Sequence, residues 1–314
     1  MSINFSSYKN ITKVNIGDKV KCGQNFQNAF TNMSSMVSCT FPVNNIVYMG
    51  NTFSNCSNLK QSPVCGNNVI NMRHTYRYCT NLIGSPVSGP KLTDMHGTYE
   101  SCTNLTGSPV SGPNVVSMRF TYINCHNITG APVCGAKVQD LIYTYNGCYN
   151  LTGAPVCGSN VVNMTGAYRY CNNLTGSPVC GPNVTEMSYA YEGCTKLTGS
   201  PVCGNKVVNM AFAYKNCNLS GNAYFTSNVI TDVSGCFQGR NTSSKLNIFI
   251  HNNSNLVNVF KTNNVKSLIG ANIHWTLSEG ITNTSHDILY YNTLYNIYIY
   301  PVSNVSQVRT NNKD

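Results

Sequence analysis

The stretch Cys171–Gly193, CNNLTGSPVCGPNVTEMSYAYEG, is followed at once by Cys194, where nearly the same 23 residues begin again. Stepping by 23 in both directions meets a cysteine each time, at Cys56, Cys79, Cys102, Cys125, Cys148, Cys171, Cys194 and Cys217. A fixed period of this length, with apolar residues in phase, is the signature of a solenoid in which each coil buries its apolar side against its neighbours.

Other columns keep the same period. An aromatic residue lies three positions before each cysteine, and an aliphatic residue lies three positions after each cysteine from Cys56 to Cys194, as Tyr191 and Leu197 do around Cys194. This spacing of three predicts a helical or 3₁₀ turn. A further column holds methionine, and Leu141 replaces it in one coil.

The conserved phrase within each coil predicts local structure. The spacing of Leu174, Ser177 and Val179 predicts a short strand with a small residue in its middle inward position. Val184 and the methionine after it form a second inward face. Gly181 and its equivalents are expected where the chain turns a corner.

The cysteines allow three interpretations: a reduced ladder, disulfides or metal ligands. Adjacent coils about 4.8 Å apart fall inside the Cα range of a disulfide, but parallel Cβ vectors miss the Cβ separation of about 3.8 Å that the bond needs. The recurrent pair is C-x8-C, which is not a zinc spacing. We expect reduced thiols, no metal and no cofactor. A second ladder, with Ser88 and Ser111 replacing cysteine in two coils, comprises Cys65, Cys134, Cys157, Cys180 and Cys203.

Composition limits the function classes. Charged residues make up 10% of the chain, and the net charge of +10 comes from 20 basic and 10 acidic residues. The basic residues form no run of five or six, so nucleic-acid binding is not expected. The first residues lack the apolar core of a secretory signal, and no apolar run is long enough to span a membrane. We therefore expect neither export by the usual route nor membrane insertion.

The phrase NVVNMTGAYRYCNNLTG at residues 160–176 resembles the repeat of BspA-like leucine-rich-repeat proteins, which occur as bacterial surface adhesins and in some phage-encoded proteins. The resemblance covers roughly residues 24–235. It implies a leucine-rich-repeat-like solenoid of about nine coils, built mainly of short β-strands with turns and 3₁₀ segments. Residues 1–23 would form an N-terminal cap.

After Cys217 the period of 23 is lost and the repeated phrase no longer occurs. We expect residues 236–314 to form a small, β-rich α+β capping domain, because the last coil would otherwise expose its apolar face. Within it, β-type runs at 246–250, 267–277 and 288–302 surround a short helix expected at 253–263. This segment also looks like the tail that follows such repeats in phage tail-associated proteins of gut bacteria.

Two columns vary between coils and favour aromatic residues. One lies two residues after the methionine and the other directly before the cysteine. Such rings could stack on sugars or anchor a protein partner, or they could shield the coil beneath. The candidate binding residues are Phe120, Tyr143, Tyr189, Phe212, Tyr78 and Tyr170.

Charged neighbours on adjacent coils are also expected. Arg77 with Glu100, and Arg169 with Glu192, should pair across one step in a column that faces solvent, each pair contributing about 0 to 1 kcal/mol.

No recurring acidic pair or catalytic motif appears. An enzymatic interpretation would have to rest on His274, His286 and Asp287 near the C-terminus.

These observations lead to one functional expectation with alternatives. We expect a non-catalytic recognition or adhesion protein that folds in the host cytoplasm and is displayed on a phage virion, on the tail or another appendage. Its partners would be other virion proteins and a host surface glycan or protein, and assembly into a homo-oligomer stays open. The alternatives are a purely structural virion decoration protein and a bacterial adhesin that reaches the cell surface by an unconventional route.

Overall fold

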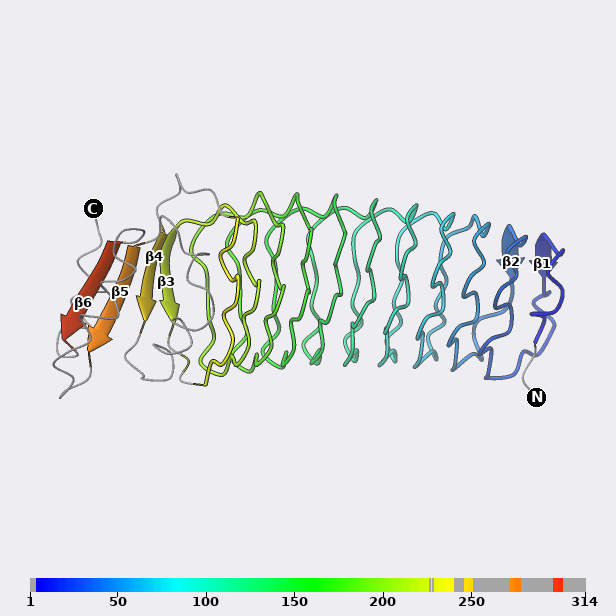
Figure 1. Ribbon diagram of the computed structural model, residues 1–314. Helices are drawn as coiled ribbons and strands as arrows, with labels where there is room; N and C mark the ends of the chain where they lie inside the picture. The colour runs from blue at the N-terminus through cyan, green and yellow to red at the C-terminus, as the bar shows by residue number, and fades with distance from the viewer. Residues whose placement is uncertain are drawn as a thin grey trace.

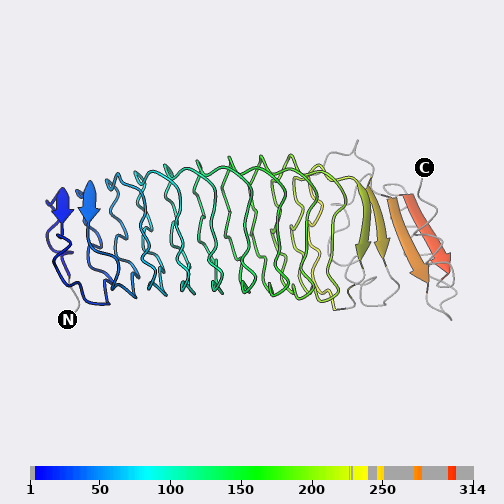
Figure 2. The same cartoon turned by 180° about the vertical axis from the view of Figure 1, so that it is seen from behind.

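The computed structural model describes residues 4–225, 227, 229–239, 246–250, 272–277 and 296–301. The chain winds into a row of stacked coils that runs from the N-terminal end to the C-terminal strands (Figure 1 and Figure 2). An unbroken series of parallel bridges joins residues 23 apart, from Asn25 and Tyr48 to Asn209 and Asp232. Each 23-residue phrase is therefore one coil of the stack, which we call the array. Its assignment to the BspA-like repeats stays a prediction.

Strands of three or more described residues lie at the two ends of the array. β1 (Lys13–Asn15) pairs in parallel with β2 (Ser38–Thr40). At the other end, a parallel four-stranded sheet has the order β3-β4-β5-β6. Its strands are β3 (Gly221–Phe225), β4 (Leu246–Ile250), β5 (Asn272–Leu277) and β6 (Asn296–Pro301). Paired residues in this sheet are 24 or 25 positions apart, so these strands continue the winding at a slightly longer period.

The C-terminal expectations fall partly on described residues. β4, β5 and β6 lie within the three β-type runs of the sequence. The helix expected at 253–263 lies outside the described residues, as do His286 and Asp287. The boundaries of the two caps stay predictions. In the described part of the chain, no helix has the length and hydropathy to cross a membrane.

The strand expected at Leu174, Ser177 and Val179 is absent. Residues 41–220 are all described, and none of them lies in a strand longer than an isolated bridge. Ser177 is exposed, and Pro178 is the buried residue in its place. A proline has no N–H to donate to a ladder, so this segment cannot continue as a paired strand.

Backbone hydrogen bonds along the axis hold successive coils together. In the turn segment after each methionine column, alternate residues donate to the next coil, as the Tyr191 N–H does to the Ala213 carbonyl at 2.8 Å. The residues between them donate three positions back within the coil, as Ala190 does to Met187 at 3.0 Å. This back-donation is the tight turn that the spacing of three predicted.

A continuous column of aromatic rings fills the centre of the array. From Phe30 to Phe237, the rings of successive coils stack with centroids 5.3 to 5.7 Å apart and planes within 13° of each other. The tyrosines among them also reach the opposite wall. Tyr145 Oη donates to the Val133 carbonyl at 2.7 Å and accepts the Val133 N–H at 3.1 Å. Each phenol thereby satisfies both backbone groups of one valine that the axial bonds leave unpaired.

The cysteine column supplies a second set of donors. From Cys56 to Cys217, each buried thiol donates to the carbonyl of the aromatic residue 26 positions earlier, at 2.9 to 3.1 Å. All sixteen cysteines of the chain are described and unpaired. The cysteines of the second ladder are half-buried. Residues in this column must fit a buried position and donate a hydrogen bond to a carbonyl. Cysteine does both, because its side chain is small and apolar and its thiol is a weak donor.

The glycine that ends the SPVCG phrase has a packing role. The Val184 N–H donates to the Gly181 carbonyl, so the chain turns here as expected. However, Gly181 does not have a left-handed backbone, and a Cβ on it would lie 2.8 Å from the Gly158 carbonyl oxygen of the preceding coil. Glycine is required here because two coils approach closely.

The phenol contacts can be tested by removing one hydroxyl. We expect Tyr145→Phe to lower the free energy of unfolding by about 1 to 3 kcal/mol, because both backbone groups of Val133 lose their partner in a buried place. Urea unfolding measures this loss. The matched control, Tyr149→Phe, alters a tyrosine that is 42% exposed and should change stability by less than about 0.5 kcal/mol. Equal effects of the two substitutions would refute the role of the phenol.

Burial of the thiols predicts a loss of stability in alkali. Desolvation raises the pKa of Cys56 from 9.0 to about 12, and the pKa of every inner thiol shifts in the same direction. Above pH 9 the unfolded chain releases protons that the folded chain retains, so stability is full below that pH and falls above it by about 1.4 kcal/mol per pH unit for each such thiol. Thermal unfolding from pH 7 to pH 10.5, with reductant present, checks this. A flat profile would contradict it.

Candidate functional site

Two columns of the turn segment in each coil have a left-handed backbone, and a third column, of glycines equivalent to Gly84, has φ between 81° and 87°. Residues equivalent to His74 have φ between 48° and 60°, and residues equivalent to Tyr78 have φ between 59° and 77°. Both kinds of residue donate along the axis: the His74 N–H bonds the His96 carbonyl and the Tyr78 N–H bonds the Glu100 carbonyl, each at 2.8 Å. The axial hydrogen bonds therefore go together with positive φ at these two columns.

Bulky side chains occupy these columns at a cost in strain. Glycine and asparagine adopt positive φ most easily, and they occur in the first column as Asn28, Asn51, Gly97, Gly166 and Gly235. Four of the candidate binding residues have the same φ with a large ring and a strain of about 1 to 2 kcal/mol each; they are Phe120, Tyr143, Tyr189 and Phe212. The other two candidates, Tyr78 and Tyr170, lie in the second column. Strained residues of this kind gather at functional sites.

The rings of the first column pack along the axis. Phe120 stacks on Tyr143 with centroids 5.9 Å apart, and Tyr189 stacks on Phe212 at 5.1 Å. Each run ends at a glycine: a Cβ on the glycine that follows Tyr143 or Phe212 in the column would overlap that ring. The four rings are half-buried. The packing therefore shields the glycine of the next coil and leaves part of each ring exposed to solvent.

Cationic side chains cover the rings. The guanidinium of Arg119 lies 4.9 Å from the Phe120 centroid, and that of Arg77 lies 4.6 Å from the Tyr78 centroid. Arg169 lies 4.7 Å from the Tyr170 ring and 5.1 Å from the Tyr189 ring, so it joins the two columns into one surface. Such cation–π contacts contribute about 0.5 to 1 kcal/mol each at exposed sites. We call this surface the ring face; it comprises Tyr78, Phe120, Tyr143, Tyr170, Tyr189, Phe212, Arg77, Arg119 and Arg169.

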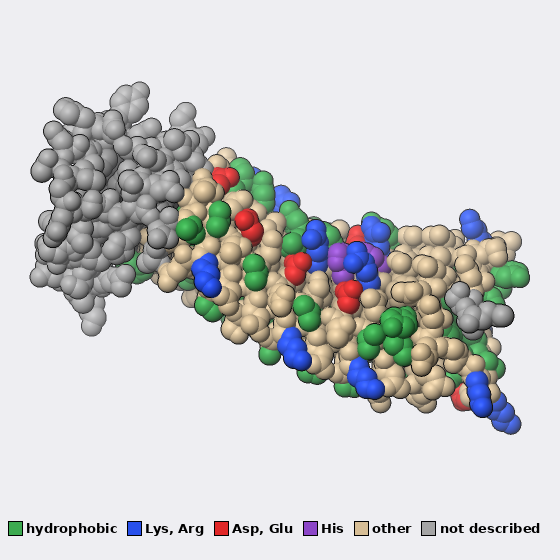
Figure 3. Space-filling model, turned by 90° about the horizontal axis from the view of Figure 1, so that it is seen from below, with side chains coloured by type: hydrophobic (Ala, Val, Ile, Leu, Met, Phe, Trp, Pro, Cys, Tyr) green, Lys and Arg blue, Asp and Glu red, His purple; other side chains and the backbone are tan. Residues whose placement is uncertain are grey.

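The surface of the array around these columns mixes all charge types. On the face drawn in Figure 3, histidine side chains lie beside basic and acidic ones near the middle of the array, and apolar side chains are scattered between them. From the sequence, Arg77 and Arg169 are expected only in ion pairs, and no role is predicted for Arg119. Their signal was nevertheless present, because Arg77, Arg119 and Arg169 each directly precede an aromatic residue of the two columns.

The two expected ion pairs form, but one is not at the surface. Arg77 Nε lies 3.0 Å from Glu100 Oε2, and Arg169 Nε lies 2.6 Å from Glu192 Oε2. The side chain of Glu192 is only 2% exposed, and Lys215 Nζ approaches its other oxygen at 3.2 Å. The expectation of a solvent-facing column was wrong at this coil, because two cations and the Tyr170 ring enclose the carboxylate.

The histidines beside the ring face stay neutral. Burial, together with the nearby cations Arg73 and Arg119, lowers the pKa of His96 to about 4. The pKa of His74 is lowered chiefly by burial as well. In the described part of the chain, no group of three or more His, Cys, Asp or Glu side chains could hold a metal ion. The arrangement suits binding through rings and guanidinium groups.

The buried carboxylate provides a stability test. Glu192→Gln keeps the size of the side chain but leaves Arg169 and Lys215 without a counter-charge. We expect it to reduce the free energy of unfolding by about 2 kcal/mol. This value lies between the loss expected when an exposed ion pair is broken and the loss expected for a buried one. Glu100→Gln is the matched control, because its carboxylate is 15% exposed, and it should lose less than about 1 kcal/mol. Urea unfolding of both variants measures the difference; a larger loss in Glu100→Gln would contradict the assignment.

Comparison with known proteins gives one partial match. The model of the Kazal-type serine protease inhibitor domain matches residues 51–82, about a tenth of the chain. These residues are part of the array, and their three cysteines, Cys56, Cys65 and Cys79, are unpaired. Small secreted domains commonly depend on disulfides, whereas this stretch is held by the axial bonds of its neighbours. No curated protein and no solved structure matches the chain.

Proposed function

We propose that this chain is a non-catalytic recognition protein carried on a phage virion, and that its ring face binds a receptor on the host surface. The observation that supports this most is the placement of the large rings. They lie in columns where the backbone has positive φ and where glycine or asparagine would fit without strain. A protein that keeps rings at such positions gains something from them other than backbone stability.

Shielding alone does not account for this choice of residues. Tyr143 and Phe212 do cover glycines of the next coil. However, the coils with Asn28 and Asn51 in the same column have the same backbone and no ring there. The array therefore forms without rings in this column, which favours a binding role for the rings where they occur.

The packing of the ring face favours a protein receptor. A sugar stacks on an open aromatic face, but here the faces are largely covered: Tyr143 lies between Phe120 and Gly166, and Arg119 lies over Phe120. Ring edges, phenol hydroxyls and guanidinium groups remain for a ligand. Tyrosine and arginine are enriched among the residues that dominate protein–protein interfaces. Rings fixed on a rigid array also lose little entropy on binding.

The virion setting follows from the resemblance of the repeat to BspA-like proteins, some of which are phage-encoded, and from the resemblance of the C-terminal segment to phage tail-associated proteins. Unpaired cysteines throughout the chain suit folding in a reducing cytoplasm. On a virion the array would serve as a rod that presents the ring face away from its attachment point.

The proposal is tested with a variant that removes the rings and keeps the backbone. Replacing Phe120, Tyr143, Tyr189 and Phe212 with asparagine uses the residue that the same column already holds at Asn28 and Asn51. We expect the variant to stay folded, because relief of strain offsets the lost stacking of about 0.5 to 1.5 kcal/mol per pair. Its binding to bacterial cells that the fluorescently labelled parent chain stains should fall at least about tenfold, since interface anchors contribute 2 kcal/mol or more.

The control removes two other exposed rings. Tyr8→Asn with Tyr149→Asn alters tyrosines that are 57% and 42% exposed and lie outside the ring face, and it should bind like the parent. Protease treatment of the cells should abolish binding, and periodate treatment should spare it. Undiminished binding by the four-ring variant, or failure of the parent to stain any bacterium in a panel of gut isolates, would overturn the proposal.

A further inference from the structure

A second surface lies in the column four residues before the methionines. Successive coils place only asparagine or lysine there: Asn45, Asn68, Lys91, Asn114, Lys137, Asn160, Asn183 and Lys206. Each lysine donates to the side-chain oxygen of the asparagine one coil earlier. The distances are 2.8 Å for Lys91, 2.7 Å for Lys137 and 2.6 Å for Lys206. We call these three residues the lysine row.

The asparagines that hold the lysines are themselves fixed. Asn68 Nδ2 donates to the Asn44 carbonyl at 2.8 Å, and Asn114 and Asn183 donate in the same way to the coil before them at 2.9 Å. An ammonium held by such an asparagine has lost part of its freedom before any ligand arrives. Preorganisation of this kind lowers the entropic cost of binding.

Among the residues that the structure describes, no acidic side chain forms an ion pair with the lysine row. The ion pairs of the described residues involve Arg77, Arg169 and Lys215 as cations, and none involves a member of the row. All three lysines are exposed. At about 4.8 Å per coil, their ammonium groups lie roughly 10 and 14 Å apart along the axis. The row therefore presents three unneutralised charges in register on a rigid rod.

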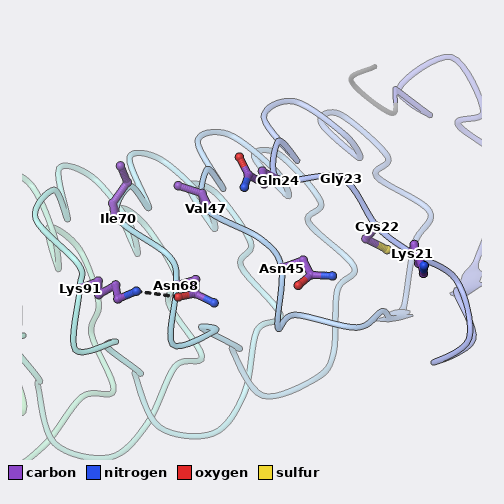
Figure 4. Close-up of a pocket in the computed structure, with 9 residues that line it drawn as sticks. All are labelled: Lys21, Cys22, Gly23, Gln24, Asn45, Val47, Asn68, Ile70 and Lys91. Carbon is purple, nitrogen blue, oxygen red and sulfur yellow. Dashed lines mark hydrogen bonds between the residues drawn. The ribbon is translucent and has the colours of Figure 1, made fainter.

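A groove continues the lysine row at its N-terminal end. It is a shallow groove that is open to solvent, with a volume of about 660 Å³. It is lined by Lys21 and Lys91, by the amides of Gln24, Asn45 and Asn68, and by the apolar side chains of Val47 and Ile70. In Figure 4, Lys21 and Lys91 lie at opposite ends with the asparagines between them, and the bond from Lys91 to Asn68 is drawn. The groove thus combines two ammonium groups with neutral amide donors and acceptors.

We propose that the groove and the lysine row form a binding site for a linear anionic polysaccharide. Ammonium groups at intervals of two or three coils suit carboxylates along an extended chain, and the amides suit its hydroxyl groups. Nucleic acid fits less well, because the column offers no ring on which a base could stack, and duplex DNA carries a charge about every 1.7 Å. The site does not use the ring face and is independent of its role.

The test measures binding of the full chain to alginate, a polyuronate, at 50 and 200 mM NaCl. Lys91→Gln with Lys137→Gln and Lys206→Gln removes the row. We expect the parent to bind alginate, the affinity to fall as salt rises, and the triple variant to bind about tenfold or more weakly. The four-ring asparagine variant should bind alginate like the parent, so failure of this site and failure of the ring face can be told apart.

The matched control removes the same charge elsewhere. Lys13→Gln with Lys60→Gln and Lys196→Gln leaves the row intact, and it includes Lys196, which donates to Asn173 at 2.7 Å as a lysine–asparagine pair in another column. It should change the affinity less than about twofold. Equal losses in both triple variants would show that only the net charge matters. That result, equally tight binding of dextran, polyglutamate or single-stranded DNA, or no binding of alginate would each overturn the proposal.

Discussion

The axial backbone hydrogen bond between successive coils is the constraint on which the rest of the structure depends. Because alternate residues of the turn segment must direct their N–H groups to the next coil, as Tyr191 does to Ala213, every coil repeats the same backbone. Two columns of this segment then adopt positive φ in each coil, and its other columns keep a fixed direction. A change in the backbone of one coil would break hydrogen bonds to both neighbouring coils. The coils therefore differ in their side chains and not in their backbone.

The interior follows from this repetition. Equivalent residues of adjacent coils are in contact along the axis. A residue type can therefore fill an interior column only if its side chain packs well against a copy of itself in the next coil. Aromatic rings do so in the central column, and each tyrosine adds a hydroxyl that satisfies a valine of the far wall. Cysteine works for a related reason, since its thiol is small, apolar and able to donate to a carbonyl such as that of Tyr99. The ladder thus has a packing role that needs no disulfide and no metal.

The same repetition turns surface residues into linear arrays. The ring face gathers strained aromatic residues and the arginines beside them, whereas the lysine row gathers ammonium groups held by asparagines such as Asn68 and Asn114. The two surfaces differ in chemistry, since one offers ring edges and guanidinium groups and the other offers charge spaced along a polar column. Under the two proposals, one rod would bind a protein receptor through the ring face and an anionic polysaccharide through the lysine row.

The period of 23 residues by itself determined which residues are neighbours along the axis. It placed Arg169 beside Glu192 because adding 23 to a residue number reaches the next coil. Only the tertiary structure decided which way each side chain points: Glu192 is enclosed, Pro178 replaces Ser177 in the interior, and Tyr143 has a left-handed backbone. The reason is that direction depends on the sign of φ and on the route of the chain around the coil. The two positive-φ columns of the turn segment hold glycine or asparagine in some coils and an aromatic residue in others. The periodicity of apolar residues therefore does not predict the sign of φ.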